Sequence, residues 1–125
     1  MNLNQVTLPA LNIAESTAFY KKIGFVQIVE SENYARFECI TGDSTFSIHK
    51  VDSVPEDTDV VIYFEIEALD DKVAELKQRG FIFWQDPKDE SWLWREARLK
   101  DPSGNIICLY FAGINRKNPL WRVAA

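Results

Sequence analysis

Hydrophobic and polar residues alternate in two runs near the end of the chain, and a tight turn joins them. Ala97 and Leu99 alternate with charged residues before Asp101-Pro102-Ser103-Gly104, and Ile107 and Leu109 continue the alternation after it. A period of two is typical of strands with two different faces. The turn has Asp first, Pro second and Gly fourth, which suits a type I turn. The pattern predicts a hairpin with an apolar core face and a mixed polar and aromatic face suited to a pocket.

Similar patterns divide the rest of the chain into strands and helices. Asn12 is a suitable N-cap and Gly24 a suitable C-terminal stop for a helix, which we expect to bury Ala14, Thr17, Ala18 and one of its two aromatic residues. The polar stretch 86–91 is predicted to be a charged loop. The predicted strands are 25–30, 34–40, 45–51, 60–67 and one beginning at 81–84, besides a first strand at 5–10; the predicted helices are 13–23 and 69–79.

The two halves of the chain repeat the same order of elements. Gly24-Phe25 and Gly80-Phe81 lie 56 positions apart, and the first strands of the two halves match at the same offset. Matches in this order indicate an internal repeat. We therefore expect a single α+β domain, 1–125, with two βαβββ modules in tandem. Its parts are module 1 at about 1–51, a linker at 52–59, module 2 at about 60–112 and a tail at 113–125.

Composition narrows the class of protein. A chain of 125 residues with 46% hydrophobic content predicts one globular domain. The net charge of −5 argues against nucleic acid or an anionic membrane as the main partner. We see no export signal and no apolar run as long as a membrane span, and the two cysteines do not form a disulfide framework. We expect a cytoplasmic protein.

Two motifs carry a resemblance to a known superfamily. They are Ser16-x-x-Phe19-Tyr20-x-x-x-Gly24-Phe25 and Asp101-Pro102-Ser103-Gly104-Asn105. The chain resembles the vicinal oxygen chelate superfamily, which includes glyoxalase I, extradiol dioxygenases and the bleomycin- and fosfomycin-resistance proteins. The resemblance implies the glyoxalase/bleomycin resistance fold, in which curved mixed sheets enclose a cup, and a homodimer. The segment WREARLKDPSGN is most similar to the bleomycin-resistance branch.

The resemblance also implies where a metal would bind in related enzymes. The four ligand positions fall on Gln5, Ser47, Val61 and Cys108. Only Gln5 is a usual ligand in the superfamily, and a valine has no donor atom, so we expect no metal and no cofactor. An alternative site would combine Gln5, His49 and Cys108.

Two classes of function follow, and a third stays open. The first is a non-catalytic binding protein for a flat, neutral or cationic small organic molecule, because three glutamates (65, 67 and 96) share the parity of the cup face with one arginine. The second is a metal-dependent glyoxalase-like lyase or dioxygenase relative. The third is a structural or partner-binding domain. We predict no catalytic residue, because Ser47 and His49 have no evident acid partner.

The expected cup face comprises residues of alternating parity from both modules. In the alternative interpretation, Tyr63 and Tyr110 fill the cup themselves and the tryptophans pack on the tail or on a dimer mate. We also expect the apolar tail residues Leu120 and Trp121 to cover the seam of a homodimer. The predicted ligand-binding residues are Gln5, Thr7, Ser47, His49, Tyr63, Glu65, Glu96, Arg98, Cys108 and Tyr110, beside Val61, with Trp92 and Trp94 near the mouth.

Overall fold

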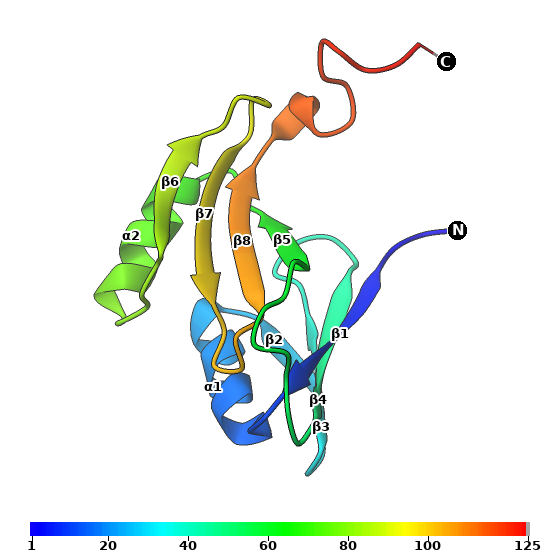
Figure 1. Cartoon of the computed structure of the whole chain (residues 1–125), viewed down its shortest axis with the longest axis vertical. Helices are drawn as coiled ribbons and strands as arrows, with labels where there is room; N and C mark the ends of the chain where they lie inside the picture. The colour runs from blue at the N-terminus through cyan, green and yellow to red at the C-terminus, as the bar shows by residue number, and fades with distance from the viewer. Residues whose placement is uncertain (125) are drawn as a thin grey trace. The chain divides into compact units, whose positions relative to one another are not determined.

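The computed structural model describes residues 1–124 and has two compact units, each with one helix and a four-stranded mixed sheet (Figure 1). Unit 1 comprises residues 1–59 and 101–105, and unit 2 comprises residues 60–100 and those from 106 onward. The predicted α+β fold of paired βαβββ modules is confirmed. In the described residues, neither helix is long and apolar enough to cross a membrane.

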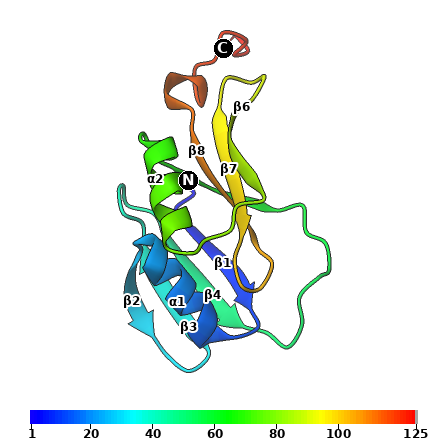
Figure 2. The same ribbon diagram turned by 90° about the vertical axis from the view of Figure 1, so that its left-hand side faces the viewer.

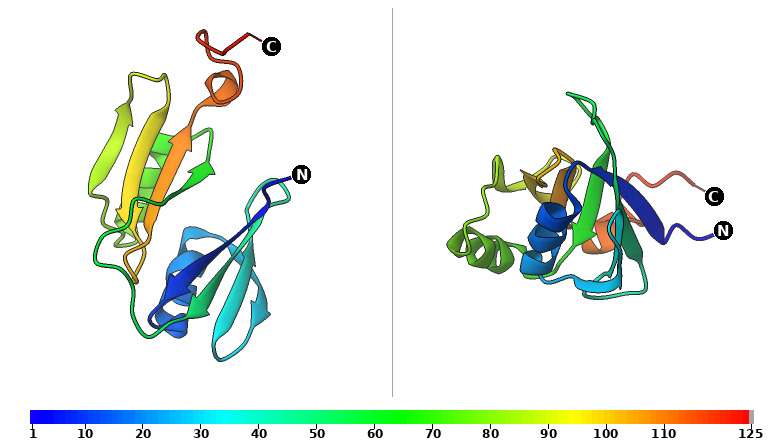
Figure 3. Two further views of the ribbon diagram at one scale, coloured as in Figure 1. Left: turned by 45° about the vertical axis from the view of Figure 1, so that its right-hand side comes forward. Right: turned by 90° about the horizontal axis from the view of Figure 1, so that it is seen from below.

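Both units have the same sheet topology. In each, the first strand runs parallel to the last strand of the unit and the other pairs are antiparallel. Figures 2 and 3 show each helix on one face of its own sheet. Unit 1 has β1 (Gln5–Ala10), α1 (Ile13–Ile23), β2 (Val26–Glu30), β3 (Tyr34–Glu38) and β4 (Thr45–Lys50), in the sheet order β1-β4-β3-β2. Unit 2 has β5 (Val61–Glu65), α2 (Leu69–Gln78), β6 (Gln85–Asp89), β7 (Arg95–Lys100) and β8 (Ile106–Phe111), in the order β5-β8-β7-β6, followed by a 3₁₀ turn, η1 (Gly113–Asn115).

The register of the two sheets repeats as well. Arg36 on β3 pairs with Ser47 on β4, and Arg98 on β7 pairs with Cys108 on β8. Because paired residues point to the same side of a sheet, each unit carries an arginine beside the central residue of its last strand. The internal repeat therefore extends from the order of the elements to individual side chains.

Helix α1 buries a different face from the one predicted. Its buried residues are Ser16, Tyr20 and Ile23, whereas Ala14 and Ala18 are exposed. The large side chains decide the orientation, because burial of Tyr20 removes far more apolar surface from water than burial of two alanines. The Tyr20 ring meets the Phe46 ring edge-on, with centroids 4.9 Å apart.

The hairpin turn between β7 and β8 is centred on a buried carboxylate, that of Asp101. Its Oδ2 accepts hydrogen bonds from the Tyr20 hydroxyl at 2.6 Å and Asn105 Nδ2 at 2.8 Å, and its Oδ1 accepts from the backbone N–H groups of Ser103 and Asn105, both at 2.9 Å. The N–H of Gly104 donates to the carbonyl of Asp101 at 3.0 Å, which is the closing bond of the predicted turn. Burial, and then the Asp101 charge, raise the pKa of Tyr20 well above its usual value. The turn is therefore fixed in unit 1.

The position of strand β6 differs from the one predicted. The charged segment expected to be a loop contains this strand, and residues 81–84 are not in a strand. Strand β6 lies at the edge of its sheet and pairs only with β7. An edge strand tolerates Pro87 and needs no apolar alternation, since one side of its backbone is unpaired. Because the segment is polar, its sequence does not show the alternation by which strands were predicted.

We predict that Tyr20→Phe lowers the free energy of unfolding by about 1–3 kcal/mol, because the buried Asp101 carboxylate loses a short hydrogen bond while the ring packing is kept. Urea denaturation measures this change. The control is Tyr63→Phe, which removes a hydroxyl from a ring that is 40% exposed and should cost less than about 0.5 kcal/mol. Equal effects of the two substitutions would contradict the role of the Tyr20–Asp101 bond.

Candidate functional site

Strand alternation gives the sheet of unit 2 one apolar face and one polar and aromatic face. Buried Ala97, Leu99 and Ile107 belong to the same unit as the inward residues of α2, and they alternate with the predicted site residues. The opposite parity forms what we call the aromatic face. Its residues are Tyr63 and Glu65 on β5, Trp94 just before β7, Glu96 and Arg98 on β7, and Cys108 and Tyr110 on β8.

Three aromatic rings pack together on the aromatic face. The ring centroids of Tyr63 and Trp94 lie 5.8 Å apart, those of Tyr63 and Tyr110 5.3 Å, and those of Trp94 and Tyr110 5.0 Å. The Trp94 indole N–H donates to the carbonyl of Asn115 at 3.1 Å, so the segment after β8 fixes this ring. The alternative interpretation of the sequence expected both tyrosines to fill the cup themselves. Tyr110 is buried, whereas Tyr63 is 40% exposed. The cluster presents a preformed wall suited to a planar molecule.

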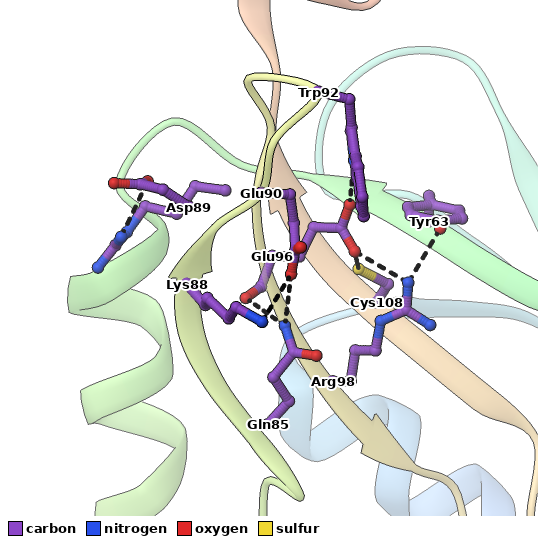
Figure 4. Close-up of polar contacts among 10 residues, drawn as sticks. Tyr63, Gln85, Lys88, Asp89, Glu90, Trp92, Glu96, Arg98 and Cys108 are labelled. Carbon is purple, nitrogen blue, oxygen red and sulfur yellow. Dashed lines mark hydrogen bonds and ion pairs between the residues drawn. The ribbon is translucent and has the colours of Figure 1, made fainter.

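A buried carboxylate beside these rings is already paired (Figure 4). Glu96 is 1% exposed; its Oε1 accepts from Arg98 Nη2 at 2.9 Å and its Oε2 from the Trp92 indole N–H at 2.8 Å. The Cys108 thiol lies 3.7 Å from Oε1. Burial opposes the charge of Arg98, but its hydrogen bond to Glu96 raises the pKa of Arg98 above its ordinary value. The buried Glu96 carboxylate and the partly buried Arg98 thus form an ion pair whose charges offset each other.

The excess of negative charge expected on this face is reduced by pairing, because Glu96 is bonded to Arg98. Strand parity also placed Glu65 there, as a residue that faces the ligand. Glu65 Oε2 instead accepts from the backbone N–H groups of Ala112 and Gly113, each at 2.9 Å, and its Oε1 lies 4.0 Å from Arg116 Nε. Glu67 lies beyond the end of β5 and is exposed. The alternation of residues along β5 could not show that backbone N–H groups after β8 bind the Glu65 carboxylate.

Unit 1 carries a hydrogen-bonded polar network on the matching face of its own sheet. The fully buried Ser47 hydroxyl accepts from Gln5 Nε2 at 2.8 Å and lies 2.5 Å from the Tyr34 hydroxyl. Arg36 Nε donates to the Tyr34 hydroxyl at 3.0 Å. The hydrogen bond with Ser47, and then the effects of Arg36, lower the pKa of Tyr34.

Sequence analysis missed Tyr34 and Arg36. The signal was present, because they alternate with the buried Ala35 and Phe37 on β3, and Arg36 occupies the register position of Arg98. Thr7 lies at the margin of the network, 3.4 Å from Gln5 Nε2.

The predicted site residues thus fall into two groups. The Ser47 hydroxyl is bonded to Gln5 and Tyr34, and His49 is an exposed residue near the end of β4. Trp92 is 42% exposed in the β6–β7 turn. Gln5, Thr7, Ser47 and His49 lie in unit 1; Tyr63, Glu65, Trp92, Trp94, Glu96, Arg98, Cys108 and Tyr110 lie in unit 2.

Two βαβββ units, each with predicted site residues on one face of its sheet, define a paired-module protein. A family model described as the Glyoxalase/Bleomycin resistance protein/Dioxygenase superfamily matches residues 2–109, and the chain belongs to this superfamily. No curated protein matches the sequence closely enough to count as a relative.

Solved structures show the same fold. A glyoxalase/bleomycin resistance protein/dioxygenase from Nocardioides has a TM-score of 0.75 and 19% identity, over 90% of this chain and 83% of that one. A bleomycin-binding protein in complex with bleomycin has a TM-score of 0.72 and 18% identity, over 89% and 98%. A bleomycin resistance determinant encoded on transposon Tn5 has a TM-score of 0.73 and 17% identity, over 89% and 98%.

The residues at the superfamily's metal positions do not fit a divalent ion. In unit 1, Gln5 and Ser47 are neutral donors bonded to each other. In unit 2, Val61 has no donor, and burial, with a further contribution from Glu96, raises the pKa of the Cys108 thiol to about 12. Cys108 also belongs to the alternative set of Gln5, His49 and Cys108. Among residues 1–124, no three His, Cys, Asp or Glu side chains are grouped as ligands.

Proposed function

We propose that this chain is a small-molecule-binding protein that holds a flat, neutral or cationic organic molecule without a metal and without covalent chemistry. One observation carries the proposal: the packed rings of Tyr63, Trp94 and Tyr110 lie on a sheet face whose buried carboxylate is already neutralised. Packed rings beside a few fixed polar groups are typical of small-molecule sites. Since the Glu96–Arg98 pair leaves no surplus charge, we favour the neutral end of this ligand class.

Two structural relatives support the choice of a binding protein. One is described as a bleomycin-binding protein in complex with bleomycin, and another as a bleomycin resistance determinant. Sequestration of a drug requires no reacting group. The alternative, a metal-dependent lyase or dioxygenase, needs a Lewis acid for which Gln5, Ser47, Val61 and Cys108 are a poor donor set. We also propose that the protein is cytoplasmic, where the free thiols of Cys39 and Cys108 would stay reduced.

We predict that Trp94→Ala weakens the binding of bleomycin or 2-naphthamide about tenfold or more, because it removes the centre of the aromatic wall. Isothermal titration calorimetry measures the change. Trp94→Phe, which keeps a ring, should bind with intermediate affinity, and thermal melting checks that both variants fold. The matched control is Trp121→Ala in the tail, which should bind as the unaltered protein does.

Prior dialysis against EDTA should leave these affinities unchanged. Failure of both probes to bind, or equal weakening by Trp94→Ala and Trp121→Ala, would contradict the proposal. Loss of binding after EDTA treatment would instead support the metal-dependent alternative.

We also propose that the protein is a homodimer held in part by its tail. Four large apolar side chains of the tail are exposed: Ile114 (73%), Leu120 (92%), Trp121 (56%) and Val123 (86%). The segment 113–125 has three basic residues and no acidic one, whereas the whole chain has a net charge of −5. An apolar and basic tail is complementary to the acidic remainder of a second copy.

The double substitution Leu120→Ser/Trp121→Ser should shift the protein from dimer to monomer at micromolar concentration, because it removes most of the exposed apolar surface of the tail. Light scattering after size-exclusion chromatography gives the mass. Ile82→Ser, which alters a comparably exposed residue outside the tail (86%), is the control and should leave the dimer intact. A monomeric unaltered protein would overturn the dimer.

A further inference from the structure

Within residues 1–124, Arg98 donates hydrogen bonds from one of its three nitrogens. Its Nη2 donates to Glu96 Oε1 at 2.9 Å and to the Tyr63 hydroxyl at 3.2 Å. Figure 4 shows both dashed lines meeting at this nitrogen and none at the other two. A guanidinium has five N–H donors, and across residues 1–124 no acceptor faces Nε or Nη1 of Arg98. These two groups are separate donors that point in different directions, since the parallel pair that includes Nε consists of Nε and Nη2, as Arg95 shows with Asp70.

The guanidinium is also fixed in position and partly withdrawn from water. Its central carbon lies 5.9 Å from the centroid of the Tyr63 ring and 6.0 Å from that of Trp84. The Arg98 side chain is only 19% exposed. Aromatic faces and the bond to Glu96 restrict its orientation, so little conformational entropy is lost when an acceptor binds. Because donors in such surroundings interact weakly with water, an acceptor oxygen delivered by a ligand gains more there than on an open surface.

We propose that the ligand places a carbonyl oxygen on the Nε–H of Arg98 while its planar part packs against the neighbouring aromatic rings. The inference rests on the proposed binding function and deepens it, because it defines the ligand class as planar aromatic molecules that bear an amide or ketone. A neutral oxygen is favoured, because the Glu96 carboxylate already balances the charge of Arg98. A cationic group without an acceptor oxygen gains no hydrogen bond from Arg98 and little attraction from so balanced a pair.

Two naphthalene probes of matched size test this assignment. 2-Naphthamide carries the carbonyl oxygen, and 2-(aminomethyl)naphthalene carries a cation and no acceptor. We expect the amide to bind about tenfold more tightly than the amine to the unaltered protein, by calorimetry. Arg98→Lys keeps the positive charge but loses the Nε–H donor, and should abolish this preference.

Arg95→Lys is the matched control, because Arg95 lies on the same strand with its side chain paired to Asp70 and Asp89. It should leave the preference intact. A second readout needs no folded variant: in the NMR spectrum of the unaltered protein, the Nε–H signal of Arg98 should shift on addition of the amide and not of the amine.

The outcomes separate the two proposals. If neither probe binds to the unaltered protein, the binding function itself fails, and the role of Arg98 fails with it. If both probes bind with equal affinity, or if the amide keeps its preference in Arg98→Lys and leaves the Nε–H signal in place, only the role of Arg98 is overturned. Tighter binding of the amine would likewise overturn it.

Discussion

The buried Asp101 carboxylate is the constraint on which the arrangement of the aromatic face depends. It accepts four hydrogen bonds, from Tyr20, Ser103 and Asn105, and no other group in the turn could satisfy those donors together. By fixing the turn, it fixes the register of β7 against β8. A slip of one residue in either strand would exchange its two faces and remove Glu96 and Arg98 from the side that carries Cys108.

Contacts beyond the hairpin strengthen this constraint. Asn105 Nδ2 donates to the carbonyl of Pro9 at 2.9 Å, and the Ser103 hydroxyl accepts from the N–H of Leu11 at 2.9 Å. Each residue of the turn that carries a polar side chain is therefore bonded within unit 1. The motif that identifies the superfamily in the sequence is, in physical terms, a turn whose polar groups all have partners.

Features that depend on neighbouring residues alone, such as helix ends and strand faces, were predicted correctly from the sequence. Asn12 caps α1 as expected, with its side chain accepting from the N–H of Glu15, and Gly24 ends that helix at a positive φ of 127°. Alternation in β7 and β8 placed the polar side chains of unit 2 on the correct face. The edge strand β6 was missed because its backbone pairing requires no apolar residues, and the buried face of α1 was missed because the ring stack around Phe46 decides it.

The chemistry of the site was harder to predict than its position. Strand alternation placed Glu65 and Glu96 on one face. It could not show that both carboxylates accept hydrogen bonds within unit 2, from Arg98, Trp92 and the backbone after β8. The superfamily's metal positions in this unit hold Val61, which has no donor atom, and the buried thiol of Cys108. The packed rings and the paired charges together describe a sheet face suited to packing and hydrogen bonding.

Intermolecular nuclear Overhauser effects between a bound planar aromatic amide and the protein test the central claim most directly, because they locate the ligand without any substitution. The account predicts contacts from the ligand rings to the ring protons of Tyr63 and Trp94. Contacts confined to other exposed apolar residues, such as Val26 and Ile28 on β2, would show that the aromatic face of unit 2 is not the binding site.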